Sequence, residues 1–388
     1  MIGRDWELPG QRRFIEEIRD HLERGDQLTI AVPARTDTRR LAECVRRATP
    51  ALAFTVLSAA RLCTGTAEPV EALLTALHIA VEPGAVPSIQ HLFVAPELAG
   101  LVVSVDGVHE INEDARTRWG TFLAEYADVS RRLSSAATVP GQIVLVVNGD
   151  PAGVDASAPG WTPLYWWGRL DRLDVGVFVH RTRPSLDRVV QSCVVEIAGF
   201  DLALAETLAY EHADDPERTV RVLTQHKHEL LHAWSEPRVR QTWCSADAPG
   251  SLTDSWACGQ VDRFDGENRA YWHSCMFVDE ARTTTIRRRI WVGQVRSILP
   301  RPEEWRVLVI EEAKAAGFIA SGINIDELEF AALHDQLRKG QRDPARARLA
   351  EFAGWLRHTR NRISHLDLVD ERTRRDGDSL AIAALRGS

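Results

Sequence analysis

Short apolar runs alternate with amphipathic segments through the first half of this chain, and the alternation limits its fold more than any other feature. The runs lie at 28–32, 54–57, 101–106, 143–147 and 175–179. Segments with a helical spacing of apolar residues lie at 10–24, 66–80 and 112–133. Runs that stay apolar throughout are typical of strands buried on both faces of a parallel sheet. The pattern therefore predicts an α/β fold with right-handed crossovers between parallel strands.

The first apolar run leads into a turn that has the position of a phosphate-binding loop but lacks its residues. A working loop reads G-x-x-x-x-G-K-[ST], because its glycines let backbone N–H groups close on phosphates while its lysine and hydroxyl bind phosphate oxygens and Mg²⁺. When Leu41 is taken as the first apolar residue of the following helix, Val32 and Asp37 occupy the glycine positions. Thr38 then stands at the lysine and Arg39 at the hydroxyl. A carboxylate ~4 Å from a phosphate repels it by about 4 kcal/mol per unit charge pair at an effective dielectric constant of ~20, so we expect no ordinary ATP binding.

The order of these parts resembles that of AAA+ or STAND-type ATPases over roughly residues 8–200. In that family one strand ends in an acidic pair, whose first residue holds Mg²⁺ and whose second polarises the attacking water. Asp106 keeps the first position, Gly107 takes the second, and Glu110 is a candidate substitute for it. The resemblance implies a P-loop NTPase-like parallel sheet followed by a mainly helical C-terminal region. Because the loop has lost its phosphate-binding residues, we expect this sheet not to hydrolyse nucleotide.

Further residues match positions of the same family. Asn148 matches the sensor position that contacts the γ-phosphate in family members, and Arg169 or Arg172 could match a trans-acting arginine. The resemblance thus gives a vestigial nucleotide site made of Thr38, Arg39, Asp106 and Asn148. A structural interpretation stays open, because an aspartate at a strand end often caps the next helix and an asparagine before a glycine is ordinary turn chemistry.

The last predicted helix, at about 344–367, contains the sequence Arg360-Asn-Arg-Ile-Ser-His365. Its apolar stripe continues from Leu356 to Arg360, so we expect the arginine to face the core or an interface. The R-x-x-x-x-H spacing resembles the signature of HEPN domains, helical bundles of which many are dimeric, metal-independent ribonucleases. In those enzymes the histidine acts as acid or base on the 2′-hydroxyl and the arginine steadies the phosphate. The resemblance makes Arg360, Asn361 and His365 candidate catalytic residues.

A purely structural role for this motif is the alternative. Arg360 would then pair with an acid such as Asp367 or Glu371, and Asn361 would cap a backbone turn. HEPN modules that only dimerise are a further alternative, and the sequence leaves all three open.

Between the sheet and this helix, a helix-proline-helix pattern resembles one found C-terminal to the ATPase core in bacterial STAND-like proteins of conflict systems. Its residues are Trp291, Gln294, Leu299, Pro300, Glu303 and Arg306. We expect helices at 284–299 and 302–316, because proline interrupts a helix interior, and a frayed tail after Asp370. The expected domains are the P-loop domain at 1–200, a helical and irregular middle domain at 201–300, and a helical, HEPN-like domain at 301–388.

The six cysteines, at 44, 63, 193, 244, 258 and 275, include no C-x-x-C pair. In a reducing compartment such thiols are usually small buried hydrophobes, so we expect no metal site. The alternative is a zinc site made of Cys244, Cys258, His273 and Cys275, although this spacing fits no established zinc finger or ribbon.

Composition favours a soluble globular protein, with 44% hydrophobic and 26% charged residues. The net charge of −8 argues against a surface generally coated by nucleic acid. No apolar run approaches the ~20 residues of a membrane helix, and the N-terminus lacks the order of a signal peptide. We therefore expect a cytoplasmic protein that does not bind membranes.

Together these features favour a catalytically inactive, P-loop NTPase-like regulatory or scaffold subunit of a bacterial defence or conflict system. Such a subunit would bind protein partners in a multi-component complex and would need no cofactor. One alternative is a HEPN-type ribonuclease that cleaves RNA as a homodimer. Another is a nucleic-acid adaptor that uses the run Arg287, Arg288 and Arg289, although adjacent arginines on a helix point in different directions.

Overall fold

The computed structural model describes residues 6–63, 67–107, 111–133, 142–148, 161–211, 213–230, 243–264, 268–279, 282–324, 328–339 and 342–385. The chain divides into two compact units. The first comprises Met1–Val175, Phe200–Ala203 and Leu230–Met276, and the second Gly176–Gly199, Leu204–Glu229 and Phe277–Ser388. The three consecutive domains expected from the sequence stay a prediction, since compact units need not coincide with domains.

The first unit is built on a five-stranded parallel sheet in the order β2-β3-β4-β1-β5. The strands are β1 (Gln27–Val32), β2 (Ala53–Ser58), β3 (Leu101–Asp106), β4 (Gln142–Asn148) and β5 (Trp161–Tyr165). Strand β1 lies between β4 and β5 and leads through a turn into helix α2 (Thr38–Ala48). This arrangement confirms the expected α/β fold with a P-loop NTPase-like parallel sheet.

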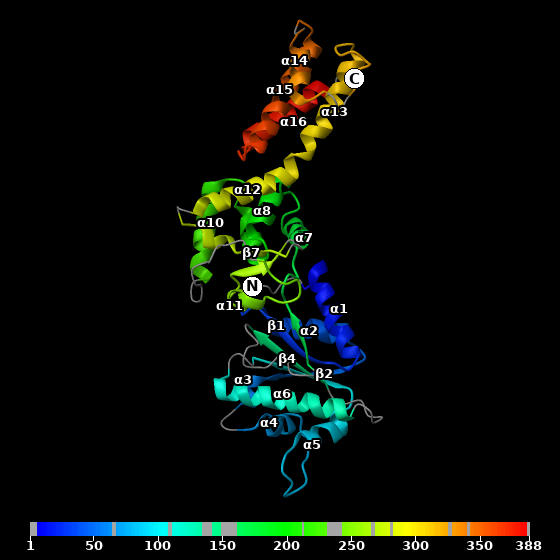
Figure 1. The fold of residues 1–388 in the computed structure, drawn as a ribbon, viewed down its shortest axis with the longest axis vertical. Helices are drawn as coiled ribbons and strands as arrows, with labels where there is room; N and C mark the ends of the chain where they lie inside the picture. Colours follow the sequence, from blue (N-terminus) through cyan, green and yellow to red (C-terminus); the bar gives the residue numbers. More distant parts are fainter. Residues whose placement is uncertain are drawn as a thin grey trace. The chain divides into compact units, whose positions relative to one another are not determined.

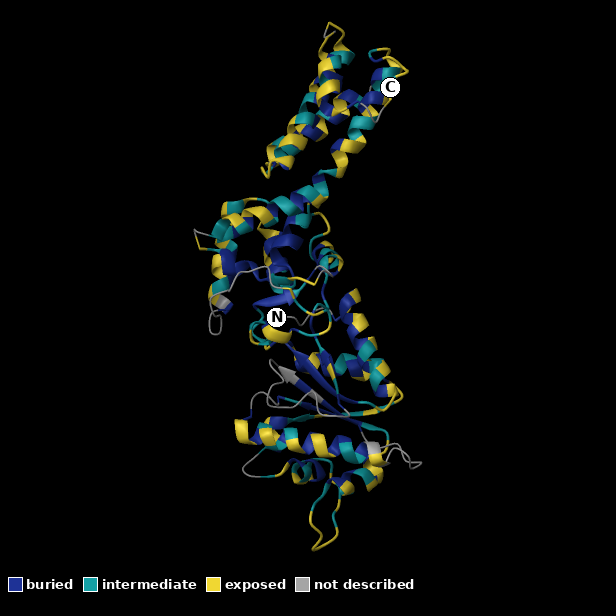
Figure 2. Cartoon of the chain, viewed as in Figure 1, coloured by how far each residue is buried: buried dark blue, intermediate teal, exposed yellow. Residues whose placement is uncertain are grey.

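Helices cover both faces of this sheet (Figure 1). Helix α1 (Pro9–Glu23) lies with α2 on one side, and α6 (Glu113–Leu133) lies on the other with the short helices α3 (Ala59–Leu62), α4 (Pro69–Ala76) and α5 (Ile89–Val94). On the α6 side, Val103 and Val105 of β3 share a buried core with Trp119 and Phe122. Because side chains alternate along a strand, Ser104 and Asp106 turn to the α2 side. Strands β1 and β3 are mostly dark blue in Figure 2, the colour of buried residues.

The expected fifth strand at 175–179 is wrong, because this run belongs to helix α7 (Arg172–Thr182). A short apolar run fits a buried helix as well as a buried strand. The signal for a helix is the pair Asp171 and Asp174, in which each carboxylate accepts the backbone N–H of the other, as in a capping box. The strand beside β1 is instead β5, which no prediction covered.

The irregular stretch expected around 242–285 forms a small subdomain of the first unit. It contains a 3-10 turn (Gly250–Leu252), α11 (Thr253–Ala257) and an antiparallel pair of β6 (Val261–Arg263) with β7 (Ala270–Trp272). Trp256 is fully buried and packs edge-on against Tyr165 at the end of β5, with ring centroids 6.0 Å apart. The subdomain therefore lies beside the carboxyl end of the sheet.

The second unit is helical. Its helices are α8 (Arg188–Ala198), α9 (Leu202–Tyr210), α10 (Pro216–Leu230), α12 (Thr283–Ile298), α13 (Pro300–Ala315), α14 (Phe330–Arg338), α15 (Pro344–Ser364) and α16 (Glu371–Leu385). The break between α12 and α13 falls at Leu299 and Pro300, close to the expected position. The frayed tail expected after Asp370 is wrong, because α16 buries Ala381 and Ala384 in one core with Phe352 and Leu356 of α15. None of the helices in the described part of the chain is long and apolar enough to cross a membrane.

Candidate functional site

The carboxyl end of β3 meets the N-terminus of α2 at one hydrogen bond, in which Thr38 Oγ1 donates to Asp106 Oδ2 at 2.7 Å. Thr38 is buried, whereas Arg39 is exposed on α2. The alignment through Leu41 gave the hydroxyl position to Arg39, but the hydroxyl that reaches the strand-end carboxylate is that of Thr38. The loop therefore matches the phosphate-binding pattern one residue earlier, and Asp37 falls at the lysine position.

Two backbone N–H groups of this loop already donate hydrogen bonds within the protein. Pro33 has no N–H, and the N–H of Ala34 donates to the carbonyl of Ala257 in α11 at 2.9 Å. The N–H of Thr36 donates to the Pro33 carbonyl at 2.9 Å. A phosphate bound in such a loop needs these N–H groups to point at its oxygens. It would have to break these bonds first.

Asp37 places a carboxylate at the N-terminus of α2, where an anion would otherwise bind. Its Oδ1 accepts the backbone N–H of Arg40 at 3.0 Å and caps α2. The N-terminus of a helix attracts anions through its free N–H groups and its dipole. Here the Asp37 carboxylate takes the place of an anion. An incoming phosphate would find the Arg40 N–H already bonded and would be repelled by the negative charge of Asp37.

The other residues of the expected nucleotide site are less fully described. Asn148 ends β4 opposite Val32 of β1, and so lies beside the start of the loop. Glu110 lies outside the described residues. The guanidinium of Arg169 forms an ion pair with Glu17 at 2.5 Å and lies 4.7 Å from the centre of the Phe14 ring. These contacts hold Arg169 within its own chain, where a trans-acting arginine would have to reach a neighbour.

A buried carboxylate that the sequence did not single out lies close to Arg169. Asp262 is 3% exposed, and its Oδ1 accepts the backbone N–H groups of Gly168 and Arg263, each at 2.7 Å. Burial raises the pKa of Asp262 to about 7, against the lowering effect of these hydrogen bonds and of the nearby Arg263 and Arg169. Nothing in the Val-Asp-Arg sequence of β6 distinguishes this aspartate from an exposed one.

The three candidate residues of the C-terminal motif, Arg360, Asn361 and His365, are all exposed. We expected Arg360 to face the core or an interface: the core is wrong, and an interface stays a prediction. The buried stripe of α15 runs from Leu356 to Thr359 and Ile363, so it advances by three residues where we expected four. Steps of three and four both keep a side chain on the same helix face, and the sequence does not tell which step occurs.

Neither expected partner of Arg360 pairs with it in the described part of the chain. Glu371 forms an ion pair with Arg375 at 2.5 Å, and Asp367 forms no ion pair with a described residue. Arg360 has no ion pair with any residue that the structure describes. Its guanidinium is therefore available to a ligand.

Helix α15 ends at Ser364, within the motif, in a turn closed by two backbone bonds. The N–H of Leu366 donates to the Ile363 carbonyl at 3.2 Å and that of Asp367 to the Arg362 carbonyl at 2.9 Å, as in a Schellman motif. Leu366 takes the left-handed position of this turn, with φ of 63°, where glycine is usual. The turn places His365 at the helix end, with its side chain exposed.

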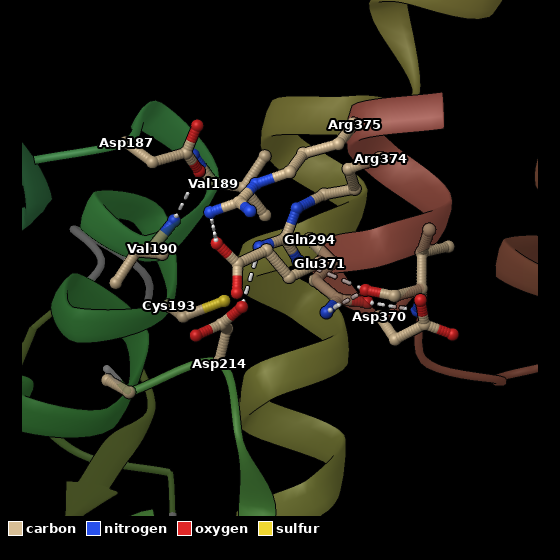
Figure 3. A network of polar contacts seen from close by, with 12 residues as sticks. Asp187, Val189, Val190, Cys193, Asp214, Gln294, Asp370, Glu371, Arg374 and Arg375 are labelled. Atoms are coloured by element: carbon tan, nitrogen blue, oxygen red, sulfur yellow. Dashed lines mark hydrogen bonds and ion pairs between the residues drawn. The ribbon is translucent and has the colours of Figure 1, made fainter. Parts of the chain in front are cut away.

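Two residues of the helix-proline-helix pattern hold this turn in place. Trp291 Nε1 donates to the Ile363 carbonyl at 2.8 Å. The Gln294 amide bonds the backbone of Val369 twice, donating at 3.0 Å and accepting at 2.8 Å. Nearby, Arg374 of α16 pairs with Asp214 at 2.6 Å, and Figure 3 shows this pair together with Gln294. The two sequence features that we treated separately thus meet in one network.

The alternative zinc site does not form. His273 Nε2 lies 3.0 Å from Asp201 Oδ2, and its Nδ1 accepts the backbone N–H of Cys275 at 3.2 Å. Within the described residues, no cysteine joins His273 in a group that could hold a metal ion. All six cysteines are free thiols.

Comparisons with known proteins do not assign the chain to a family. No model of a protein family matches the chain, and no curated protein matches it. Two solved structures of the RuvB Holliday junction branch migration motor of Thermotoga maritima, one of them a point variant, are similar to it. They are 13% and 12% identical over 59% of this chain and 67% of theirs, each with a TM-score of 0.33. Because both TM-scores are low, this likeness says nothing of what the chain binds, and the fold assignment rests on its own sheet.

Proposed function

We propose that the chain is a catalytically inactive, P-loop NTPase-like subunit whose sheet serves as a platform for protein partners. The observation that carries the proposal is the loop after β1. Its Ala34 N–H is bonded to Ala257, its helix is capped by Asp37, and no lysine stands where a phosphate would need one. A sheet that keeps its architecture without a phosphate site retains its surfaces, and these are what a partner can bind.

The resemblance to AAA+ and STAND-type proteins supports a role as regulatory or scaffold subunit of a bacterial defence or conflict system. In such a complex another subunit would carry the working nucleotide site. Proteins bound to the tagged chain in its native host, identified by mass spectrometry, would name that subunit. Recovery of the chain alone at native expression level would contradict the scaffold role.

Nucleotide binding directly tests the proposal that the loop after β1 holds no phosphate. The full chain is incubated with millimolar ATP or GTP, with and without Mg²⁺, and its thermal unfolding and phosphate release are measured. We expect no Mg²⁺-dependent stabilisation and no release. A Mg²⁺-dependent rise of several degrees that disappears in Asp106→Asn would overturn the proposal.

A HEPN-type ribonuclease is the second candidate, and the exposure of Arg360, Asn361 and His365 on one end of α15 favours it. An arginine without a carboxylate partner can bind a phosphate, and an exposed histidine can exchange protons with a 2′-hydroxyl. The candidate requires that two copies bring these residues to one RNA strand.

Single-stranded RNA and tRNA are the substrates with which to test it. His365→Ala should abolish cleavage, whereas His358→Ala, a change of another exposed histidine on α15, should leave it intact. Equal loss in both variants, or no cleavage by the wild type alone and with its partners, would remove this candidate.

A further inference from the structure

The parallel sheet of the first unit has two edges, and they differ in how they would receive a further strand. Strand β5 forms one edge and contains the exposed Pro163, which has no N–H to donate. Strand β2 forms the other edge, and its sequence Ala53-Phe-Thr-Val-Leu-Ser58 has neither a proline nor a charge. Prolines and charges are common means by which proteins keep an edge from pairing. The β2 edge lacks both.

The backbone of β2 is paired on one side only. Residues Ala53 to Ser58 lie opposite Leu101 to Asp106 of β3. Apart from this ladder, residues 53–57 form no backbone hydrogen bond with any residue that the structure describes. In an edge strand, N–H and C=O groups point away from the neighbouring strand in a regular row. An extended polypeptide is the ligand that satisfies such a row, because its own donors and acceptors alternate in the same way.

The side chains of β2 divide between the two faces of the sheet. Leu57 packs against the buried core on the α6 side. Phe54 and Val56 lie on the α2 side, because Val56 is level with Ser104 of β3, which turns to that side. Val56 is 47% exposed, whereas Ser104 is buried. A strand added beside β2 would cover this exposed apolar side chain.

Helix α2 lies over β3, the strand next to this edge, and its outer face is basic. Arg39, Arg40, Arg46 and Arg47 are all exposed, and Glu43 is the only acidic residue of the helix. Glu43 pairs with Arg47, but the other three arginines form no ion pair with any residue that the structure describes. The whole chain carries a net charge of −8, so this face has the opposite sign. It would attract a segment that carries carboxylates.

Two other occupants fit these features less well. A second copy would pair β2 with β2 about a twofold axis perpendicular to the sheet, and this axis would bring two basic α2 faces to the same side. Their like charges would oppose the contact. A nucleic acid would meet the arginines but has no peptide groups with which to continue the ladder of β2.

We propose that the β2 edge binds an extended, acidic segment of a partner protein, which adds a sixth strand to the sheet. The backbone of this segment pairs with β2, and its carboxylates face the arginines of α2. This docking mode rests on the proposed function, because it names the surface on which the sheet serves as a platform and the kind of segment that binds there.

A fluorescent peptide of alternating valine and glutamate, as long as β2, tests the proposal. Its anisotropy is measured with the full chain at low ionic strength, where surface charges are least screened. We expect this peptide to bind and a peptide of valine and lysine not to bind. The glutamate peptide with every backbone nitrogen methylated keeps its charges but has no N–H donors. It should bind at least about tenfold more weakly, because the ladder cannot form.

Two double variants test the part played by charge. Arg39→Gln/Arg46→Gln should weaken binding of the glutamate peptide roughly fivefold, since it removes two exposed charge pairs. Arg287→Gln/Arg288→Gln, on α12 of the second unit, is the matched control and should bind as the wild type does. All four arginines are exposed, so unchanged thermal unfolding should show that both variants fold. No binding by the wild type, equal binding of the methylated peptide, or equal loss in both variants would overturn the proposal.

The proteins recovered with the tagged chain separate this docking mode from the scaffold role. Val56→Asp places a negative charge at the edge, where it repels an acidic segment, and Val86→Asp changes another exposed valine. Partners that are lost from Val56→Asp but kept by Val86→Asp, with both variants folded by thermal unfolding, would support the proposal. Partners kept by both would overturn docking at β2 and leave the scaffold role standing. The absence of any partner of the wild type would contradict the scaffold role itself.

Discussion

At the scale of single residues, Leu366 shows strain next to a candidate site. A non-glycine residue whose backbone lies in the left-handed region lowers the stability of the fold by roughly 1–2 kcal/mol. Such residues are frequent where function requires a fixed conformation. Here Gln294, Trp291 and Arg374 hold the turn from outside, so the strain persists.

Replacing Leu366 by glycine should therefore stabilise the protein. Glycine adopts φ of 63° without a steric penalty, and Leu366 is 58% exposed, so little burial is lost. We expect the free energy of unfolding in urea to rise by about 1 kcal/mol. Leu366→Ala keeps the penalty and is the matched control. A loss of stability in Leu366→Gly, or an equal gain in both variants, would show that the turn is not strained.

The buried Asp262 predicts a pH dependence of the first unit. Its pKa is about 7 in the folded chain and near 3.8 when unfolded, so the folded state binds the proton more tightly. Its stabilising contribution is complete below the unfolded pKa and is lost as the pH rises through 7. Between pH 6 and pH 8 the free energy of unfolding should fall by about 1 kcal/mol on this account.

Asp262→Asn removes the titration and keeps the oxygen that accepts from Gly168 and Arg263. Urea unfolding at pH 6 and pH 8 measures the effect. The loss between the two values should be smaller in the variant than in the wild type. An identical pH dependence would mean that Asp262 does not titrate in this range.

At the scale of elements, the sequence predicted the helices and strands that have a clear apolar periodicity. It missed elements whose type depends on tertiary contacts. Strands β1 to β4 and helices α1, α6, α12 and α13 were expected, because their apolar patterns are long or strictly placed. The run 175–179 fitted strand and helix equally, and the capping pair Asp171 and Asp174 decided for the helix. In the candidate site, the alignment was one residue out because it was fixed on Leu41, the first apolar residue of the helix, and only the contact of Thr38 with Asp106 fixes the register.

The packing of helix α16 explains why its charged sequence was predicted to be a frayed tail. It packs on α15 through small residues, and Gly377 touches the ring of Trp355. Few large apolar residues are needed where two helices approach so closely, and periodicity then gives little signal.

This close approach predicts an unusual response to Gly377→Ala. In a free helix the change would stabilise by roughly 0.5–1 kcal/mol. Here the added Cβ would lie 2.1 Å from the Trp355 ring, so the ring or the helix must shift. We expect a loss of about 1–3 kcal/mol in urea unfolding, as for other overpacked cores. Ser379→Ala on the exposed side of α16 should change stability by much less, and a gain in Gly377→Ala would contradict the close packing.

At the scale of the whole molecule, contacts with distant segments limit phosphate binding at the loop after β1 as much as its own sequence does. The subdomain around α11 supplies the Ala257 carbonyl that binds Ala34 N–H, and Pro33 removes a further donor. One side chain would therefore not free this loop for a phosphate. The bond that occupies the Ala34 N–H joins segments more than two hundred residues apart in the sequence, at residues 34 and 257.

The variant Asp37→Lys tests this interdependence. It restores the lysine of the phosphate-binding pattern in the register set by Thr38, and it removes the carboxylate that would repel a phosphate. We nevertheless expect no Mg²⁺-dependent ATP hydrolysis and no stabilisation by ATP·Mg²⁺, because the loop N–H groups stay bonded to Ala257 and Pro33. The variant loses the α2 cap as well, so a fall of about 1 kcal/mol in stability is expected, as in a matched Asp37→Ala. ATP turnover in Asp37→Lys but not in Asp37→Ala would show that the side chain alone had closed the site.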